Sequence, residues 1–305
     1  MLVVLRLSLG FHFLYEGLWK VKHRDFSAAP FLTQAKGPAA PLFYAMINDL
    51  DGRQRLAMET DAKSGKKTIP GKMYLTAWGG LKSEVAEKYK LDAKQKKTVD
   101  AIYGRYAAVL ESYLKENADE IVAHFGSLDR FEESLRQGNN GAEHQKKRIW
   151  DRRMELRKEA GGWLTELDKL TDSYKQALWA TLTPQQRAMG DLPEHWTQAD
   201  LMDFAVKYGL SAIGLCLLVG FCTRLAAIGG GCFMISVLLT QPPWPTIYPP
   251  APEVVGHALL VDKNFVEMVA LFLVATTAVG RWAGLDYFLY HFVGRRVEAY
   301  FAQKV

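Results

Sequence analysis

The stretch LVVLRLSLGFHFLYEGLW, from Leu2 to Trp19, carries only two charged side chains and is long enough to cross most of a bilayer as a helix. Three similar stretches follow only after residue 200: Phe204 to Phe221, Leu225 to Thr240 and Phe265 to Val279. A bilayer core about 30 Å thick needs roughly 20 mostly apolar residues per helix, and fewer where flanking side chains reach the interface. The sequence therefore predicts an all-α protein with a four-helix transmembrane bundle.

Charged residues are concentrated between the first and second of these stretches. Residues 45–200 hold 26 of the 38 Lys and Arg and 25 of the 33 Asp and Glu, so the mean hydropathy of −0.09 averages a membrane part with a soluble part. The net charge of this segment is 26 minus 25, or +1, which offers no basic face for nucleic acid. We assign residues 1–24 to the first transmembrane helix, 25–200 to an inserted soluble domain, and 201–305 to transmembrane helices two to four and a C-terminal tail.

The first stretch could instead be a secretory signal peptide, because the small residues Ala28 and Ala29 follow at a distance that suits cleavage. However, no basic residue precedes Arg6, and Glu16 and Lys20 would crowd the region before the cut. The sequence therefore favours a retained transmembrane helix.

The inserted domain is predicted to be a helical hairpin. Its first helix begins at Asp92, whose side chain can cap the helix while Gln95 reciprocates three residues later. Apolar residues then recur at spacings of three and four as far as Phe125. The Gly and Asn residues at 138–141 break the pattern, and a second apolar stripe follows. We expect the two helices to pack against each other in an antiparallel hairpin that is stable in water.

Three of the apolar segments resemble the DoxX family, also described as the DoxX/DoxD or thiosulfate:quinone oxidoreductase small-subunit group. The run GLCLLVGFCTRLAAIGGG, from Gly214 to Gly231, resembles a signature in which a Gly-rich helix ends at a Thr-Arg turn and Leu-Ala-Ala begins the next helix. The run LRLSLGFHFLYEGLWKVK, from Leu5 to Lys22, is similar to the first helix of that family, and DKNFVEMVALFLVATTAVGRWAGLD, from Asp262 to Asp286, is similar to its fourth. The inserted domain is a difference from the family, because a compact member would lack it.

The resemblance implies a multipass protein of the bacterial or archaeal plasma membrane and, for some members, a quinone-linked redox complex. Because the sequence shows no metal or flavin motif, we expect any electron centre to belong to a partner protein, which makes this chain a component of a membrane oxidoreductase. The alternative is a non-enzymatic membrane scaffold whose external helical domain binds a partner protein. Both hypotheses remain open at this point.

Ionisable side chains within the membrane helices form the candidate site, because an unpaired charge facing hydrocarbon is costly. His12, Glu16 and Lys20 lie four residues apart on one face of the first helix, Arg6 lies elsewhere on it, and Glu267 lies near the start of the fourth. In one interpretation, His12 and Glu16 handle the protons of quinone reduction while Arg6 or Lys20 holds an anion. In the other, a Glu16–Lys20 or Arg6–Glu267 pair only fixes the helix register. Both place these side chains inside the bundle.

The loop from Thr240 to His257 holds six of the twelve prolines, together with Trp244 and Tyr248. Pro-rich backbone is stiff, and Trp and Tyr favour the membrane interface, so we expect a lid over the mouth of the bundle. Two roles for this loop stay open: an interfacial anchor and a surface that binds a ring such as a quinone headgroup. The run Gly229 to Gly231 lacks the context of a phosphate loop and indicates close helix packing.

Orientation follows from the basic residues beside the apolar stretches. Five lie at each end, but the short turn at Arg224 and the C-terminal tail are more reliable markers than residues beside a long insert. We therefore expect both termini in the cytoplasm and the insert on the extracytoplasmic side of the inner (plasma) membrane.

Overall fold

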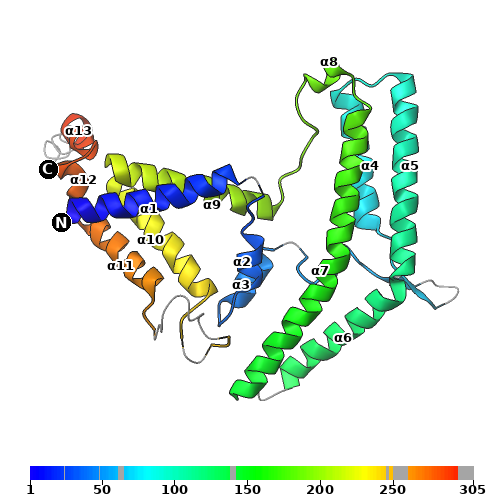
Figure 1. Cartoon of the computed structure of the whole chain (residues 1–305), viewed down its shortest axis with the longest axis horizontal. Helices are drawn as coiled ribbons and strands as arrows, with labels where there is room; N and C mark the ends of the chain where they lie inside the picture. Colours follow the sequence, from blue (N-terminus) through cyan, green and yellow to red (C-terminus); the bar gives the residue numbers. More distant parts are fainter. Residues whose placement is uncertain are drawn as a thin grey trace, which may run out of the picture. The chain divides into compact units, whose positions relative to one another are not determined.

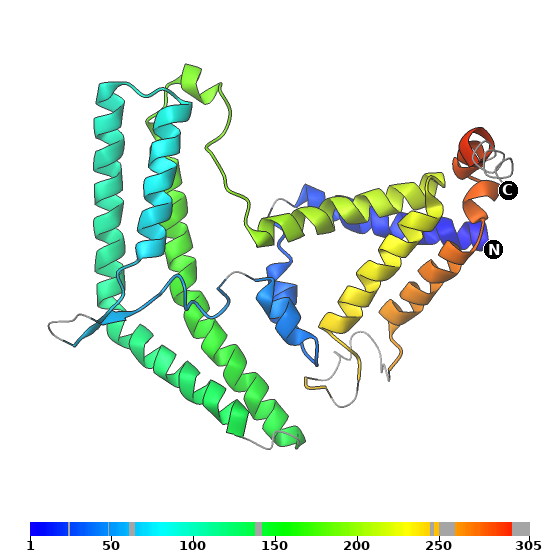
Figure 2. The same cartoon turned by 180° about the vertical axis from the view of Figure 1, so that it is seen from behind.

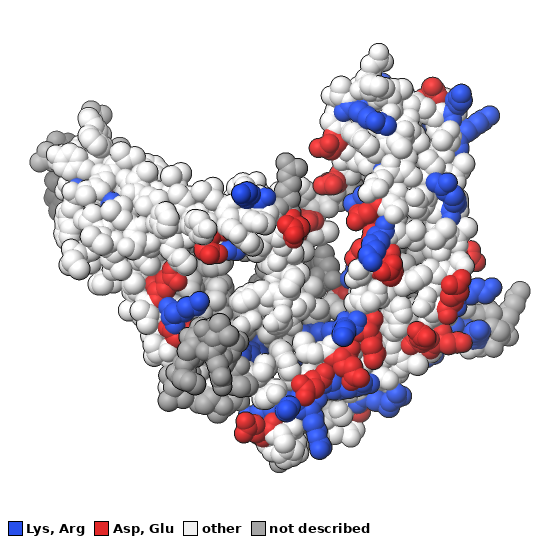
Figure 3. Space-filling model, in the orientation of Figure 1, with Lys and Arg blue, Asp and Glu red and all other residues white. Residues whose placement is uncertain are grey.

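The computed structural model describes residues 1–23, 25–47, 49–60, 65–137, 142–244, 247–249 and 260–294. The chain divides into two compact units, one of Met1–Asn48 with Trp196–Val305 and one of Asp49–His195. Both units are mostly helical, which confirms the predicted helical class (Figure 1). On the face drawn in Figure 3, charged side chains are dense on the second unit and sparse on the first.

Among the described residues of the first unit, three helices are long and apolar enough to cross a membrane. They are α1 (Leu2–Lys22), α9 (Gln198–Val219) and α10 (Thr223–Thr240). The fourth predicted span is α11 (Lys263–Thr276), which at about 1.5 Å per residue is about 21 Å long and thus shorter than a bilayer core. The hydroxyls of Thr276 and Thr277 bond to carbonyls one turn back, and Thr277 adopts an extended conformation that ends the helix.

Two helix pairs make the core of the first unit: α1 packs along α9, and α10 packs along α11 (Figures 1 and 2). Leu9, Phe13, Leu217 and Leu271 are among the buried side chains between them. The close packing predicted at Gly231 is present, because a Cβ at this position would lie 2.7 Å from the Phe272 ring. After α11 the chain continues through α12 (Val279–Trp282), α13 (Asp286–Leu289) and the π-helical turn η2 (Tyr290–Gly294).

The first unit also contains two short helices that we had placed in the insert, α2 (Ala29–Thr33) and α3 (Ala40–Ala45). The Ala28 amide donates to Asp203 Oδ1 at 2.6 Å, and the Lys36 amide donates to the Thr240 carbonyl at 2.9 Å. These contacts explain why the second compact unit starts at Asp49 and not at residue 25.

The second unit is organised along α7 (Glu143–Ala180). Figures 1 and 2 show α4 (Lys72–Lys88) and α5 (Ala93–Glu116) beside one part of α7, and α6 (Ala118–Gln137) beside the other. A small antiparallel pair, β1 (Glu59–Thr60) with β2 (Lys67–Thr68), and the short helix α8 (Pro184–Arg187) complete the unit. The Asp92–Gln95 capping box is present as predicted. The predicted Gly/Asn turn at 138–141 lies outside the described residues.

The second unit contains more helices than the predicted two-helix hairpin, for two reasons. The helix that we predicted from Asp92 through Phe125 is divided at Asn117, whose side-chain amide donates to the Tyr113 carbonyl at 2.8 Å and so competes with regular helix bonding. Helix α4 was missed altogether. Its buried Tyr74, Trp78 and Val85 follow a helical spacing, but they stand among polar and glycine residues.

The polar groups of Trp78 and Tyr174 in the aromatic core form hydrogen bonds, but the hydroxyl of Tyr74 does not, within the part of the chain that the structure describes. Trp78 Nε1 donates to Thr171 Oγ1 at 3.2 Å, and the Tyr174 hydroxyl donates to the Trp78 carbonyl at 3.1 Å. The buried Tyr74 hydroxyl has no hydrogen-bond partner among the described residues. Burial raises the pKa of Tyr74 to about 12. The unfolded chain therefore loses this proton near pH 10 while the folded chain keeps it, so this group lowers stability as the pH rises from about 10 to 12.

Tyr74→Phe is expected to weaken that pH dependence. At pH 7 the variant should be as stable as the parent or up to about 1 kcal/mol more stable, because an unpaired buried hydroxyl is removed. Above pH 10 its free energy of unfolding should fall less steeply, by up to about 1.4 kcal/mol per pH unit. Urea unfolding of residues 49–195, followed by circular dichroism, measures both. The control is Tyr106→Phe, which removes a hydroxyl that donates to the Ser173 carbonyl. Equal slopes for Tyr74→Phe and the parent would contradict the prediction.

Candidate functional site

A pocket of about 540 Å³ opens among α1, α9, α10 and α11 of the first unit. We call it the α1–α11 pocket. It contains four of the residues singled out in the sequence, together with apolar and polar residues from the neighbouring helices. Its lining consists of His12, Phe13, Glu16, Lys20, Leu210, Phe233, Met234, Val237, Lys263, Asn264 and Glu267.

Helical spacing and one helix cap place the polar side of this pocket. His12, Glu16 and Lys20 share a face of α1 because they are four residues apart. On α11, the Asp262 side chain accepts the Phe265 amide at 2.8 Å and so fixes where the helix begins. Glu267 follows one turn after Lys263 and therefore lies on the same side of α11.

Two contacts between charged or ionisable groups line the pocket. His12 Nε2 lies 3.6 Å from Glu267 Oε1, which joins α1 to α11. Lys20 Nζ lies 2.6 Å from Glu16 Oε2, within α1 itself. The Glu267 side chain is 18% exposed and that of His12 is 56% exposed, so the carboxylate is enclosed while the imidazole faces the open part of the pocket.

The structure separates Arg6 from this group. Arg6 is 2% exposed and its Nη2 donates to the Ala283 carbonyl at 2.7 Å, so the Arg6–Glu267 pair considered from the sequence is not formed. The Glu16–Lys20 pair is formed, but it lies within one helix and cannot set the register between helices. Arg6 and Glu267 lie inside the bundle as we expected. The same expectation is wrong for His12 and Glu16, because their side chains are 56% and 44% exposed and lie at the open side of the pocket.

Trp244 and Tyr248 lie beyond the end of α10. Trp244 is 40% exposed and Tyr248 is half-buried, and neither lines the α1–α11 pocket. Most of the predicted lid, including residues 250–257, lies outside the described residues.

Sequence reasoning missed Lys263, Asn264 and the apolar wall. The signal for Lys263 and Asn264 was available, because they precede Glu267 by four and three residues in a helix capped by Asp262. Phe13 and Phe233 required the fold, since their rings meet edge to face, with centroids 6.3 Å apart, between α1 and α10.

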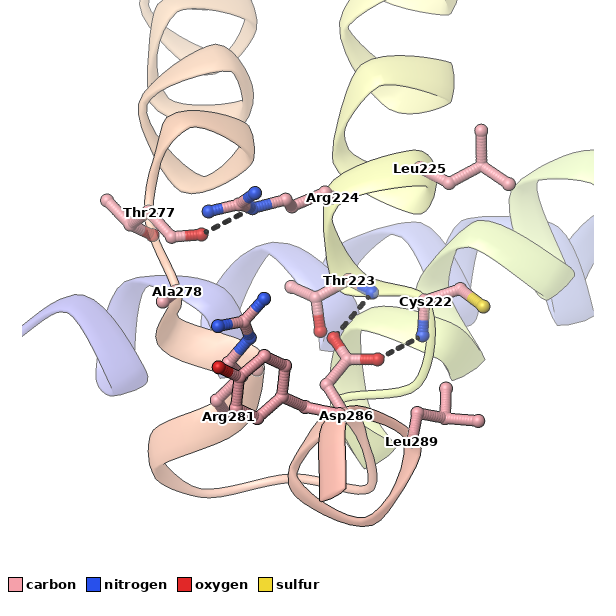
Figure 4. A pocket seen from close by; sticks show the side chains of 11 residues that line it. Cys222, Thr223, Arg224, Leu225, Thr277, Ala278, Arg281, Asp286 and Leu289 are labelled. Carbon is pink, nitrogen blue, oxygen red and sulfur yellow. Dashed lines mark hydrogen bonds between the residues drawn. The ribbon is translucent and has the colours of Figure 1, made fainter. Parts of the chain in front are cut away.

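A second pocket, of about 470 Å³, lies at the other end of α10 (Figure 4). Asp286 organises it: Oδ1 accepts the Cys222 amide at 2.7 Å and Oδ2 accepts the Thr223 amide at 2.9 Å, so a residue far along the chain caps α10. Gly280 leaves the space for the Asp286 carboxylate and the Thr223 hydroxyl, because a Cβ there would overlap both.

The described residues include no cluster of three or more His, Cys, Asp or Glu side chains that could hold a metal ion. A comparison with protein-family models found no match. Comparisons with curated proteins and with solved structures likewise found none.

Proposed function

We propose that this chain is a DoxX-like subunit of a quinone-linked redox complex in the plasma membrane, and that the α1–α11 pocket binds the quinone headgroup. The observation that supports this most directly is the His12–Glu267 contact, which brings two ionisable groups together at the wall of a pocket that is apolar on one side and polar on the other. Ionisable groups in such positions commonly serve ion or proton pathways.

The size and lining of the pocket suit a ring that carries polar substituents. Its volume of about 540 Å³ is within the range of small-molecule sites, which combine apolar walls with a few polar groups. Phe13, Phe233 and Met234 offer ring and thioether surfaces for the faces of a quinone. His12, Lys263 and Asn264 offer hydrogen-bond donors for its two carbonyl oxygens.

Reduction of a quinone to a quinol takes up two electrons and two protons. In our proposal the electrons come from a redox centre on a partner protein, because the chain shows no flavin or metal motif. One proton passes from His12 to the quinone, and the second passes along the His12–Glu267 pair after water reprotonates it through the exposed side of the pocket. The Glu16–Lys20 pair, one turn away, keeps that side hydrated.

The membrane orientation belongs to the same proposal. Arg224 and the basic C-terminal tail favour the cytoplasmic side, which places the second unit outside the cell. The end of the bundle with the α1–α11 pocket, where α1 ends and α11 begins, is then the extracytoplasmic end.

A membrane scaffold whose second unit binds a partner protein is the alternative function. It is supported by the second unit itself, which has its own buried core and a densely charged surface (Figure 3). Under this hypothesis the pocket side chains are dispensable.

Glu267→Gln is expected to slow quinone reduction by about 100-fold in membranes that contain the complex, because the shape is kept while a proton carrier is lost. Quinone that copurifies with the protein, quantified by solvent extraction, should remain. Phe233→Ala should instead lower the amount of bound quinone. The control is Asp25→Asn, which removes an exposed carboxylate just beyond α1. If no quinone copurifies, or if all variants retain quinone and activity, the scaffold hypothesis replaces the redox one.

A further inference from the structure

Two arginines border the second pocket at the opposite end of the bundle from the α1–α11 pocket. Arg224 comes from the first turn of α10 and Arg281 from α12, and both line the same 470 Å³ cavity. Figure 4 shows their side chains on the side of the pocket formed by Thr277 and Ala278. Both are exposed, so they reach the cavity from its open rim.

Both guanidinium groups have N–H donors that no described residue uses and that could bind a ligand. Arg224 Nε donates to the Thr277 carbonyl at 3.2 Å, which leaves both terminal nitrogens. The Arg281 guanidinium lies over the Tyr290 ring, with Cζ 3.8 Å from the ring centroid, and this cation–π contact does not use its N–H donors. Neither arginine forms an ion pair with a carboxylate of the described residues.

Asp286 is the one carboxylate among the described residues that line the pocket, and it does not neutralise the two arginines. The Asp286 carboxylate accepts hydrogen bonds from two backbone amides at the start of α10, and it is also attracted by the buried Arg6. The charges of Arg6 and Asp286 therefore offset each other, and the charges of Arg224 and Arg281 remain. The Thr223 hydroxyl is a third polar group: Thr223 is 1% exposed, lines the pocket, and its Oγ1 has no hydrogen-bond partner among the described residues.

An apolar groove adjoins the arginine pocket. It measures about 330 Å³, shares Leu289 with the pocket, and is lined by Phe221, Leu285, Phe288, Leu289 and Phe292, without polar surface. A ligand that spans both sites must carry an anionic group at one end and a hydrocarbon chain at the other.

We propose that this composite site binds an anionic phospholipid, with its phosphate between Arg224 and Arg281 and an acyl chain in the apolar groove. Arginine matches phosphate oxygens in a fork geometry, and basic pockets at the ends of membrane helices recognise anionic headgroups. A free phosphate would use the arginines and leave the groove empty, so the groove favours the lipid as the source of the phosphate. This site is independent of the proposed quinone pocket.

Native mass spectrometry and thermal melting of the full-length protein in detergent test the site, with phosphatidylglycerol, phosphatidylcholine or inorganic phosphate added. Phosphatidylglycerol is expected to bind and to raise the melting temperature, and phosphatidylcholine is not. Arg224→Gln and Arg281→Gln should each weaken phosphatidylglycerol binding by about tenfold, since each removes charge-assisted hydrogen bonds. Phe288→Ser should also weaken it. The control is Lys22→Gln, which removes an exposed charge near the far end of α1.

Melting without lipid identifies variants that do not fold, and these are excluded. If Arg224→Gln does not fold, Arg224→Lys replaces it, because lysine keeps the charge but not the two-pronged hydrogen bonding of the guanidinium. Equal binding of the two phospholipids overturns the proposal, as does unchanged phosphatidylglycerol binding by both arginine variants. Stabilisation by inorganic phosphate that matches phosphatidylglycerol and is unaffected by Phe288→Ser also overturns it, because it identifies a soluble anion.

Discussion

Gly214→Ala is expected to destabilise the first unit by about 3 kcal/mol, the upper part of the range for overpacking, although it adds a single methyl group. A Cβ at this position would lie 2.6 Å from the Leu14 Cα and 2.7 Å from its Cβ. Backbone atoms cannot rotate away as a side chain can, so α1 and α9 would have to separate along their shared face. In a bilayer, where no hydrophobic force favours one helix pair over lipid, such close packing supplies much of the association energy.

Gly209→Ala is the matched control, five residues earlier on α9. A Cβ there meets no atom within 4 Å, and alanine is the better helix former, so this variant should be as stable as the parent or slightly more stable. Thermal melting in detergent, followed by tryptophan fluorescence, compares the two. A similar loss in both variants would show that α1 and α9 do not cross at Gly214 as described.

Local features of this fold were predictable from the sequence, because their determinants lie within a few residues. Asp92 and Gln95 form the predicted capping box, and the Thr197 cap fixes the start of α9 in the same way. The i, i+4, i+8 spacing placed His12, Glu16 and Lys20 along one pocket wall. In each case the physics is that of one helix turn.

Features that depend on distant residues were not predictable. His12 meets Glu267 only because α11 packs beside α1, and nothing in either segment distinguishes this contact from the Arg6–Glu267 pair. Asp286 caps α10 from a position 63 residues beyond Thr223, a distance at which no local pattern operates. Likewise, the apolar stretch continues to Val279, but α11 ends at Thr276, where two threonine hydroxyls bond back to the helix.

The environment of Arg6 is the feature furthest from sequence reasoning. Its side chain is fully enclosed near the start of α1, and its guanidinium lies against both Gly220 and Gly284. A Cβ on Gly220 would collide with its Nη1, and a Cβ on Gly284 would lie 2.8 Å from the same atom. Gly220 also has a φ of +68°, so it is required both by the turn after α9 and by the arginine. Asp286 is the charged group that faces the guanidinium.

Arg6→Ala is therefore expected to lower the stability of the first unit by about 3–5 kcal/mol, because it leaves a cavity, an unpaired Ala283 carbonyl and a carboxylate without its counter-charge. Arg6→Met should cost less, since Arg6 Nε and Nη1 have no partners among the described residues and methionine keeps most of the packing. Combining Arg6→Met with Asp286→Asn should cost less than the sum of the single losses, by about 0.5–3 kcal/mol, because each change removes the same attraction. Melting in detergent measures the cycle, with Lys22→Met as the exposed control on α1. If the two stability losses are strictly additive, Arg6 stabilises α12 only through its hydrogen bond to Ala283. If Arg6→Met costs no more stability than Lys22→Met, Arg6 does not stabilise α12.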